Sequence, residues 1–212
     1  MTSPAPRVGV LALQGDFACH QGTLAAFGVE VVRVSQPRDL GALDALVMPG
    51  GESTTMLRLM DVMGIREPLR RFVSSKPVLA TCAGLILLAT DVPGLPAPTL
   101  ATLDATVERN AYGRQIDSFA DEVRIPAVGG AFPGVFIRAP RIRRVGAGVE
   151  PIAWHGDEVV GVRQGKSVGI CFHPELTQDP RFHRWFLSEV AGLVPASAGA
   201  EASRPEARKG RP

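Results

Sequence analysis

Long apolar runs are absent from this 212-residue sequence. No run approaches the roughly 18 residues that a membrane-spanning helix needs. The N-terminus lacks a basic region followed by an apolar stretch, so we expect no signal peptide. The formal net charge is only +2, whereas a nucleic-acid-binding domain usually carries a strongly basic face. We therefore expect neither a membrane nor a nucleic acid among the partners.

Cysteine is scarce, with only Cys19, Cys82 and Cys171 in the whole chain. The number is odd and no two of them share a Cys-x-x-Cys spacing, which argues against a disulfide framework and against a zinc knuckle. A reducing, cytoplasmic location fits this usage best. We expect no metal and no organic cofactor. Cys19 and Cys171 are expected in or near the core, since free cysteine is commonly buried.

The first half of the chain alternates short apolar runs with helical segments. The length suits one sizeable domain better than two, and 45% apolar with 21% charged residues is typical of a globular protein. We expect strands at residues 8–13, 30–34, 45–48 and 77–80, with helices at 17–27, 53–63 and 65–74. This alternation predicts a three-layer αβα fold with a mostly parallel, flavodoxin-like central sheet and flanking helices.

The second half has a different texture, with short strands separated by turn residues. Candidate strands are 102–107, 134–137, 159–162 and 167–170, which would form an antiparallel extension of the sheet, and 181–191 reads as an amphipathic helix. Residues 110–133 are polar and contain glycine, so they support no definite assignment. We expect a single domain over residues 1–194. Residues 195–212 have almost nothing to bury and are expected to be disordered.

Residues 77–89 place a cysteine between a buried strand and a helix with no spacer. A sharp strand-to-helix turn holds its central side chain up at the carboxyl edge of a sheet, and Ala80 and Gly84 are small enough to flank such a turn. The helix N-terminus favours thiolate over thiol. Cys82 is therefore a candidate nucleophile. From this stretch alone, a buried core cysteine remains the alternative.

A cysteine nucleophile needs a base, and the base needs an orienting partner. The chain has four histidines. Pro174 favours an extended conformation at His173, and residues two apart in an extended segment point the same way. Glu175 can thus lie beside His173, which predicts a triad of Cys82, His173 and Glu175; a surface turn with a solvated histidine is the alternative. His20 is expected to face solvent or a partner and to have no catalytic role.

Residues 48–55 form a second strand–turn–helix pattern, Met-Pro-Gly-Gly-Glu-Ser-Thr-Thr. A glycine pair ending at Gly51 lets the backbone present N–H groups to a negative centre, and Ser53 or Thr54 can cap the helix. No Gly-Lys-Ser/Thr follows, which argues against a phosphate-binding P-loop. In the functional interpretation, the N–H groups of Gly51 and Ala83 stabilise an oxyanion beside the cysteine. In the alternative, this is only a tight turn with a cap.

Together these motifs resemble one family, the glutaminase subunits of pyridoxal 5′-phosphate synthase, which are class I (triad) glutamine amidotransferases. The resemblance runs from about Val8 to Ala191. The stretches that carry it are Leu11-Ala-Leu-Gln-Gly15, Pro49-Gly-Gly-Glu-Ser-Thr-Thr-Met56, Thr81-Cys-Ala-Gly84, Val107-Glu-Arg-Asn110, Gly113-Arg-Gln115, Val135-Phe-Ile-Arg-Ala-Pro140 and Phe172-His-Pro-Glu-Leu176.

The resemblance implies hydrolysis of L-glutamine to glutamate and ammonia. Cys82 would attack the side-chain amide carbon, His173 would take the thiol proton and pass one to the leaving ammonia, and Glu175 would hold the imidazole. A thioester would form and be hydrolysed, each step passing through an oxyanion. By position, the family's substrate contacts correspond to Gly51, Glu52, Ser53, Arg109, Ile137 and Arg138.

The resemblance also implies a partner, a synthase subunit that would receive the ammonia and build the pyridoxal phosphate ring within a large hetero-oligomer. In the family, docking to that subunit generally activates the glutaminase, and Gln14 lies in a stretch used near the active site and the interface. Ala80 departs from the glycine that the family usually has there. Other hypotheses are a triad amidotransferase of another pathway, another cysteine hydrolase, or a non-enzymatic docking module.

Overall fold

The computed structural model describes residues 4–109 and 118–194 of the chain. The Gly113-Arg-Gln115 motif and the tail at 195–212, with its expected disorder, lie outside the described residues. Within the described ranges, no helix is both long and apolar enough to cross a membrane.

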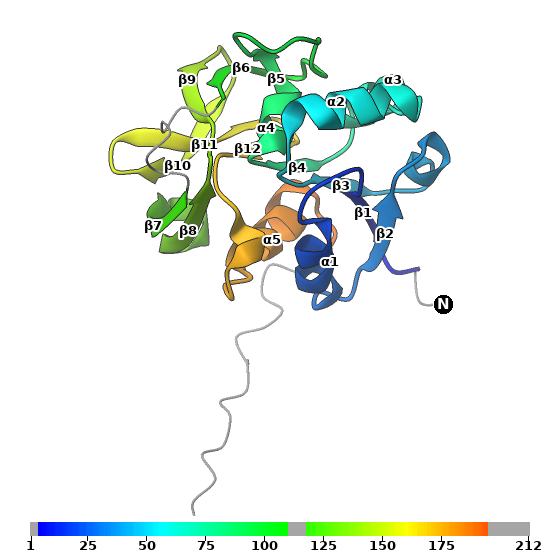
Figure 1. Ribbon diagram of the computed structural model, residues 1–212. Helices are drawn as coiled ribbons and strands as arrows, with labels where there is room; N and C mark the ends of the chain where they lie inside the picture. Colours follow the sequence, from blue (N-terminus) through cyan, green and yellow to red (C-terminus); the bar gives the residue numbers. More distant parts are fainter. Residues whose placement is uncertain (1–3, 110–117, 195–212) are drawn as a thin grey trace, which may run out of the picture.

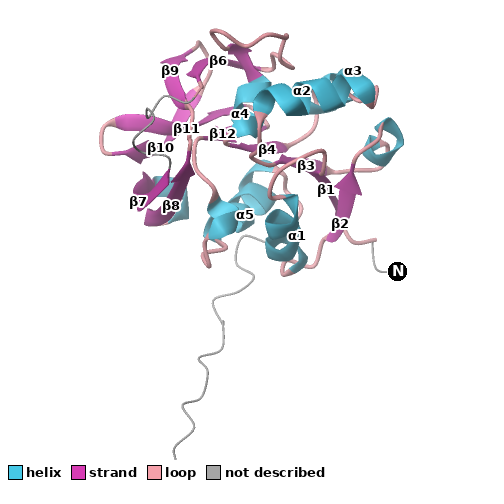
Figure 2. Ribbon diagram, in the orientation of Figure 1, coloured by secondary structure: helices cyan, strands magenta, loops and turns pink. Residues whose placement is uncertain are grey.

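A nine-stranded sheet forms the centre of the fold, and a smaller, three-stranded sheet packs beside it (Figure 2). The strands of the large sheet are β1 Arg7–Leu11, β2 Glu30–Val34, β3 Ala45–Met48, β4 Val78–Thr81, β7 Ser118–Ile125, β8 Gly130–Ile137, β10 Glu150–His155, β11 Glu158–Gln164 and β12 Ser167–Ile170. Those of the small sheet are β5 Ala89–Asp91, β6 Leu103–Glu108 and β9 Arg141–Val145.

The large sheet has the order β2-β1-β3-β4-β12-β11-β10-β7-β8. Strands β2, β1, β3, β4 and β12 pair in parallel, whereas every pair from β12 to β8 is antiparallel. The predicted parallel sheet with an antiparallel extension is therefore confirmed. The carboxyl ends of the adjacent strands β3, β4 and β12 share one edge, and an open parallel sheet binds its ligand at that edge.

Helices cover both faces of the parallel half. The helices are α1 Phe17–Ala25, α2 Ser53–Val62, α3 Arg66–Val73, α4 Ala83–Leu88 and α5 Arg181–Trp185, which continues as a π-helical turn over Phe186–Val190. Short 3-10 turns span η1 Pro37–Leu40, η2 Pro126–Val128 and η3 Pro174–Leu176. Figure 1 shows α2, α3 and α4 on one side of the sheet and α1 and α5 on the other, which is the predicted three-layer arrangement.

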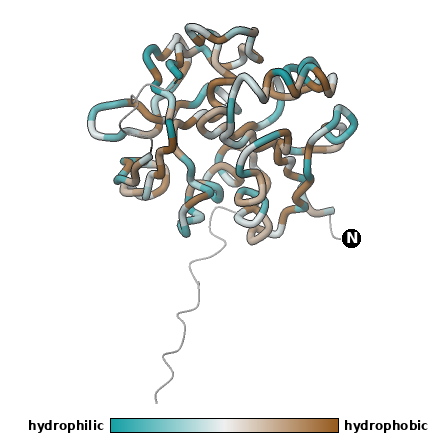
Figure 3. The backbone as a smooth tube through the Cα atoms, viewed as in Figure 1, coloured by the Kyte–Doolittle hydropathy of each residue, from teal (hydrophilic) through white to brown (hydrophobic). Residues whose placement is uncertain are grey.

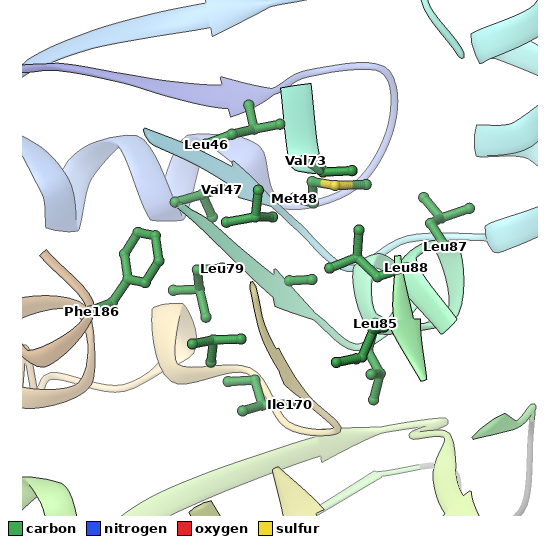
Figure 4. Close-up of a cluster of buried hydrophobic side chains, with 14 of the residues drawn as sticks. Leu46, Val47, Met48, Val73, Leu79, Leu85, Leu87, Leu88, Ile170 and Phe186 are labelled. Atoms are coloured by element: carbon green, nitrogen blue, oxygen red, sulfur yellow. The ribbon is translucent and has the colours of Figure 1, made fainter. Parts of the chain in front are cut away.

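The core lies on the two faces of β3 and β4, in which every residue is buried. A parallel strand covered on both faces is apolar throughout rather than alternating, which explains the run Ala-Leu-Val-Met. In Figure 3 the central strands are mostly brown, whereas the outlying turns are teal. Figure 4 shows part of this core, with labels on Leu46, Val47, Met48, Val73, Leu79, Leu85, Leu87, Leu88, Ile170 and Phe186.

The predicted strands of the parallel half are found within one or two residues of their expected bounds. The predictions missed β5 as well as β7, β9 and β10 in the other half. Most of β7 and two of the five residues of β9 are exposed, so these strands have no apolar run to reveal them. The aromatic face of the terminal helix is buried as predicted, with Phe182, Trp185 and Phe186 in the core.

Candidate active site

Cys82 occupies the turn between β4 and α4 with a backbone conformation that non-glycine residues rarely adopt. Its φ and ψ are 48° and −105°, and such positions are strained and cluster at functional sites. The Cys82 N–H donates to the Ile170 carbonyl at 2.8 Å, which ties the turn to β12. A methyl group on Gly84 would lie 2.2 Å from the Met48 carbonyl oxygen. The predicted sharp turn is present, and a close approach of backbone to helix requires its glycine.

His173 and Glu175 lie beside this turn. The His173 N–H donates to the Val135 carbonyl at 2.8 Å, and the Nδ1 atom of its ring lies 2.7 Å from Oε1 of Glu175. A methyl group on Gly50 would lie 2.4 Å from His173 Cε1 and 3.3 Å from Cys82 Cβ. Cys82 and His173 therefore flank the same point, and the fold brings the three predicted triad residues together.

The backbone that joins His173 to Glu175 differs from the prediction. The sequence predicts an extended segment with the two side chains on one face, but Pro174–Leu176 forms a 3-10 turn. Proline suits the first position of such a turn because its φ is already helical and its missing N–H is not needed there. The turn folds Glu175 back towards the imidazole. The predicted contact between His173 and Glu175 is therefore present, but a 3-10 turn and not an extended segment produces it.

The environment of the pair shifts both pKa values. Burial by itself would lower the pKa of His173, but hydrogen bonding and charge from Cys82 and Glu175 raise it to about 10. Burial would raise the pKa of Glu175, but its electrostatic interactions with His20 and His173 hold that pKa well below its ordinary value. Glu175 therefore stays ionised, and His173 can take and hold a proton beside the Cys82 sulfur.

A cavity of about 360 Å³ opens over Cys82 and His173. This size suits a small molecule. All six predicted substrate contacts line it, together with Cys82, His173 and four residues that were not predicted as site residues. The full lining is Gln14, Gly15, Asp16, Gly51, Glu52, Ser53, Cys82, Ile86, Arg109, Ile137, Arg138 and His173.

Glu52 caps α2 from the rim of the cavity. Its carboxylate accepts hydrogen bonds from the backbone N–H groups of Thr54 at 3.0 Å and Thr55 at 2.6 Å, so the prediction of a Ser53 or Thr54 cap was wrong. Partial burial opposes ionisation, but these bonds lower the pKa of Glu52 to about 2. Arg109 Nη2 lies 3.5 Å from Glu52 Oε1. The cavity thus presents an anionic and a cationic group side by side, as a zwitterionic ligand requires.

The glycine turn is held by a side chain from the loop after β1. The Gln14 Oε1 atom accepts the Glu52 N–H at 2.6 Å, and a methyl group on Gly51 would lie 2.6 Å from that oxygen. Gly51 has a φ of 155°. Ala83 does not line the cavity, but it is the first residue of α4, where the N–H has no acceptor within the helix.

Two predictions about residues near α1 were wrong. Cys19 is exposed rather than in the core. His20 is fully buried, and its Nε2 lies 3.3 Å from Glu175 Oε2. The signal was available in the sequence, because His20 and Leu24 are four residues apart and both lie on the face of α1 that packs inward.

Among residues 4–109 and 118–194, no group of three or more histidine, cysteine, aspartate or glutamate side chains could hold a metal ion.

Known proteins resemble this chain over nearly all of its described length. The SNO glutamine amidotransferase family matches residues 10–192. The protein named pyridoxal 5′-phosphate synthase subunit PdxT of Geobacillus kaustophilus is 49% identical over 193 residues, which cover 91% of this chain and 98% of that protein. A protein of the same name from Thermus thermophilus is 51% identical over 189 residues, covering 88% and 98%.

A solved structure agrees with these relatives. The crystal structure described as a glutamine amidotransferase superposes with a TM-score of 0.82 at 49% identity, covering 88% of this chain and 99% of that one. The chain therefore belongs to the SNO glutamine amidotransferase family.

Proposed function

We propose that this chain hydrolyses L-glutamine to L-glutamate and ammonia as the glutaminase subunit of a pyridoxal 5′-phosphate synthase. The observation that carries the proposal is a single cavity lined by both Cys82 and His173, with Glu175 Oε1 2.7 Å from the imidazole. Membership of an amidotransferase family supports the reaction, and the shared name of the relatives supports the pathway.

In the first half-reaction, Cys82 forms the bond to the substrate. His173 takes the thiol proton, and the sulfur attacks the side-chain amide carbon of glutamine. The carbonyl electron pair moves to the oxygen, where the N–H groups of Gly51 and Ala83 hold the negative charge. When the pair returns, the C–N bond breaks, His173 gives its proton to the leaving nitrogen, and ammonia departs from a thioester.

In the second half-reaction, water replaces ammonia. His173 takes a proton from the water as its oxygen attacks the thioester carbon, which forms a second oxyanion in the same place. Collapse of this oxyanion breaks the C–S bond and releases glutamate, and His173 returns its proton to the sulfur, which restores the Cys82 thiol. Glu175 remains ionised throughout and keeps Nδ1 of His173 protonated and oriented, so that Nε2 faces the reacting atoms.

The charged groups of the cavity suit the free amino acid. Glutamine presents an α-carboxylate and an α-ammonium besides its amide. We propose that Arg109 or Arg138 pairs with the carboxylate, while Glu52 or the Ile137 carbonyl accepts from the ammonium, with Gly51 and Ser53 completing the contacts. Arg138 has a φ of 41°, and this strained backbone aims the Ile137–Arg138 peptide at the ligand.

The ammonia needs an acceptor protein. We propose that this is the synthase subunit, that the two form a large hetero-oligomer, and that the reaction takes place in the cytoplasm. The naming of the relatives as subunits of one synthase supports a partner. The near-neutral charge of the chain gives no reason to invoke a nucleic acid.

Replacing Cys82 by alanine tests the proposal. Ammonia release from glutamine, measured with the synthase subunit present, should fall by at least about 10³-fold, because triad members act as a unit. Cys19→Ala is the matched control, since Cys19 is exposed and lies outside the cavity, and it should retain full activity. Unchanged turnover in the Cys82 variant, or no turnover of glutamine by the unmodified complex, would refute the proposal.

A further inference from the structure

A row of buried polar side chains continues behind the triad, away from the cavity. His20 and His183 are fully buried, and Glu175 is nearly so. Nε2 of His20 lies 3.3 Å from Oε2 of Glu175, and Nδ1 of His20 lies 3.0 Å from Nε2 of His183. Each of these side chains comes from a different segment, α1, η3 and α5. Buried polar groups in such a row satisfy one another's hydrogen-bonding capacity.

His20 is the residue that contacts Oε2 of Glu175, the carboxylate oxygen that His173 does not contact. Oε1 of the carboxylate is taken by His173, and Oε2 has no regular hydrogen bond from the described residues. A buried carboxylate oxygen without a donor is costly. His20 Nε2 lies 3.3 Å from this oxygen and 3.4 Å from the buried Thr81 hydroxyl, and a proton on this nitrogen offsets the burial of the carboxylate oxygen.

The contact between the two histidines determines which nitrogen carries each proton. If His183 donates from Nε2, His20 accepts at Nδ1 and must carry its own proton at Nε2, facing the carboxylate. In the reverse direction His183 accepts at Nε2 and must carry its proton at Nδ1, and a neutral His20 would then face the carboxylate with a bare nitrogen. The His183 Nδ1 atom has no partner among the described residues, and an orphaned buried donor is more costly than an orphaned acceptor.

We infer that His20 is a positioning residue for the glutaminase triad: its Nε2–H donates to Glu175 Oε2, and its tautomer is set by a hydrogen bond from His183 Nε2–H to its Nδ1. This inference rests on the proposed function for its kinetic consequence but not for its geometry. Burial lowers the pKa of His183 to about 3, which keeps that residue neutral and able to take the required tautomer.

The role of His20 is to hold the orientation of the Glu175 carboxylate, which in turn holds the orientation of the His173 imidazole. With both oxygens held from opposite sides, Glu175 has one orientation, and so does the imidazole that faces Cys82. His20 does not line the cavity within the described residues. Its loss should therefore lower kcat without changing KM, because the substrate contacts remain in place.

The ring nitrogens report the tautomers directly, whether or not the chain is active. A long-range ¹H–¹⁵N correlation spectrum of the full chain shows which nitrogens of each histidine are protonated, and the spectra of His20→Gln and His183→Gln assign the signals. We expect a proton on Nε2 and none on Nδ1 in both His20 and His183. A proton on Nδ1 of His20 would overturn the inference.

Kinetics with the synthase subunit present test the consequence. His20→Leu removes the donor and should lower kcat on the order of tenfold, the scale at which losing an outer hydrogen-bond partner affects histidines at metal sites. His20→Gln places an amide N–H where Nε2 stood and should recover most of that loss. Leu24→Ala, on the same face of α1, is the control for packing and should lower stability while leaving kcat near that of the unmodified chain.

The outcomes separate this inference from the proposed function. If the unmodified complex releases no ammonia from glutamine, the proposed function fails, and the ring-nitrogen spectrum still decides the arrangement of His20 and His183. If the complex is active but His20→Leu and His20→Gln are equally impaired, or neither is impaired, the positioning role fails while the proposed function stands.

Discussion

The two strand-to-helix turns that border the cavity share a strand–turn–helix pattern but present different groups to the ligand. The turn from β3 to α2 passes through Gly50 and Gly51, and Glu52 caps the helix that follows. The turn from β4 to α4 passes through Cys82, which adopts a positive φ with no capping hydrogen bond from its side chain. The first turn must present bare backbone, so glycine suits it. The second must present a sulfur atom, so the chain accepts strain there.

The largest effect should come from filling the space under the cysteine turn. Gly84→Ala would place a methyl group 2.2 Å from the backbone oxygen of Met48, and the resulting overpacking should cost about 3 kcal/mol of unfolding free energy. Gly22→Ala is the matched control, because Gly22 lies in α1 with nothing within 4 Å of an added methyl. That change should stabilise the helix by about 1 kcal/mol. Chemical denaturation measures both, and a Gly84 variant as stable as the unmodified chain would contradict the packing.

The comparison also shows which parts of the fold could be predicted. Strands β3 and β12 were located to the residue because helices or strands cover them on all sides, so every residue in them is buried and their sequences carry no charge. Strand β9, Arg-Ile-Arg-Arg-Val, was missed because its charged side chains are paired or solvated and leave no pattern. A hydrophobic pattern in the sequence arises from burial of the side chains. The antiparallel half of the sheet has exposed faces, so its sequence gave little indication of its strands.

The candidate site was predictable for a different reason. Cysteine and histidine are rare in this chain, with three and four copies, so few pairings of a nucleophile with a base were available. The burial of His20 was missed because its four-residue spacing from Leu24, which places both on the inward face of α1, was not used. Glu52 was missed as a cap because serine and threonine are the usual choice. Ala80, where the family usually has glycine, is fully buried within β4, so the alanine methyl is accommodated beside the turn.

A medium effect should appear when the strain at Cys82 is relieved. Cys82→Gly and Cys82→Ala both remove the nucleophile, but only glycine adopts a φ of 48° without steric cost. Relief of about 1–3 kcal/mol of strain, set against the greater freedom of glycine in the unfolded chain, should leave the glycine variant about 1 kcal/mol more stable than the alanine variant. Paired denaturation curves measure the difference. An alanine variant that is equally stable would show that the turn is not strained.

The smallest effect should come from the cap of the other turn. Glu52→Gln keeps the shape of the side chain but replaces one acceptor oxygen with an amide, and should cost about 1 kcal/mol, the usual value of an N-cap. Because the pKa of Glu52 is lowered to about 2, its contribution is present above the ordinary value of 4.5 and is lost as the pH falls towards 2. The difference in stability between the unmodified chain and the glutamine variant should therefore shrink between pH 5 and pH 2. A difference that does not change over this range would mean that the charge of Glu52 does not stabilise the helix, and the two turns would then differ in strain alone.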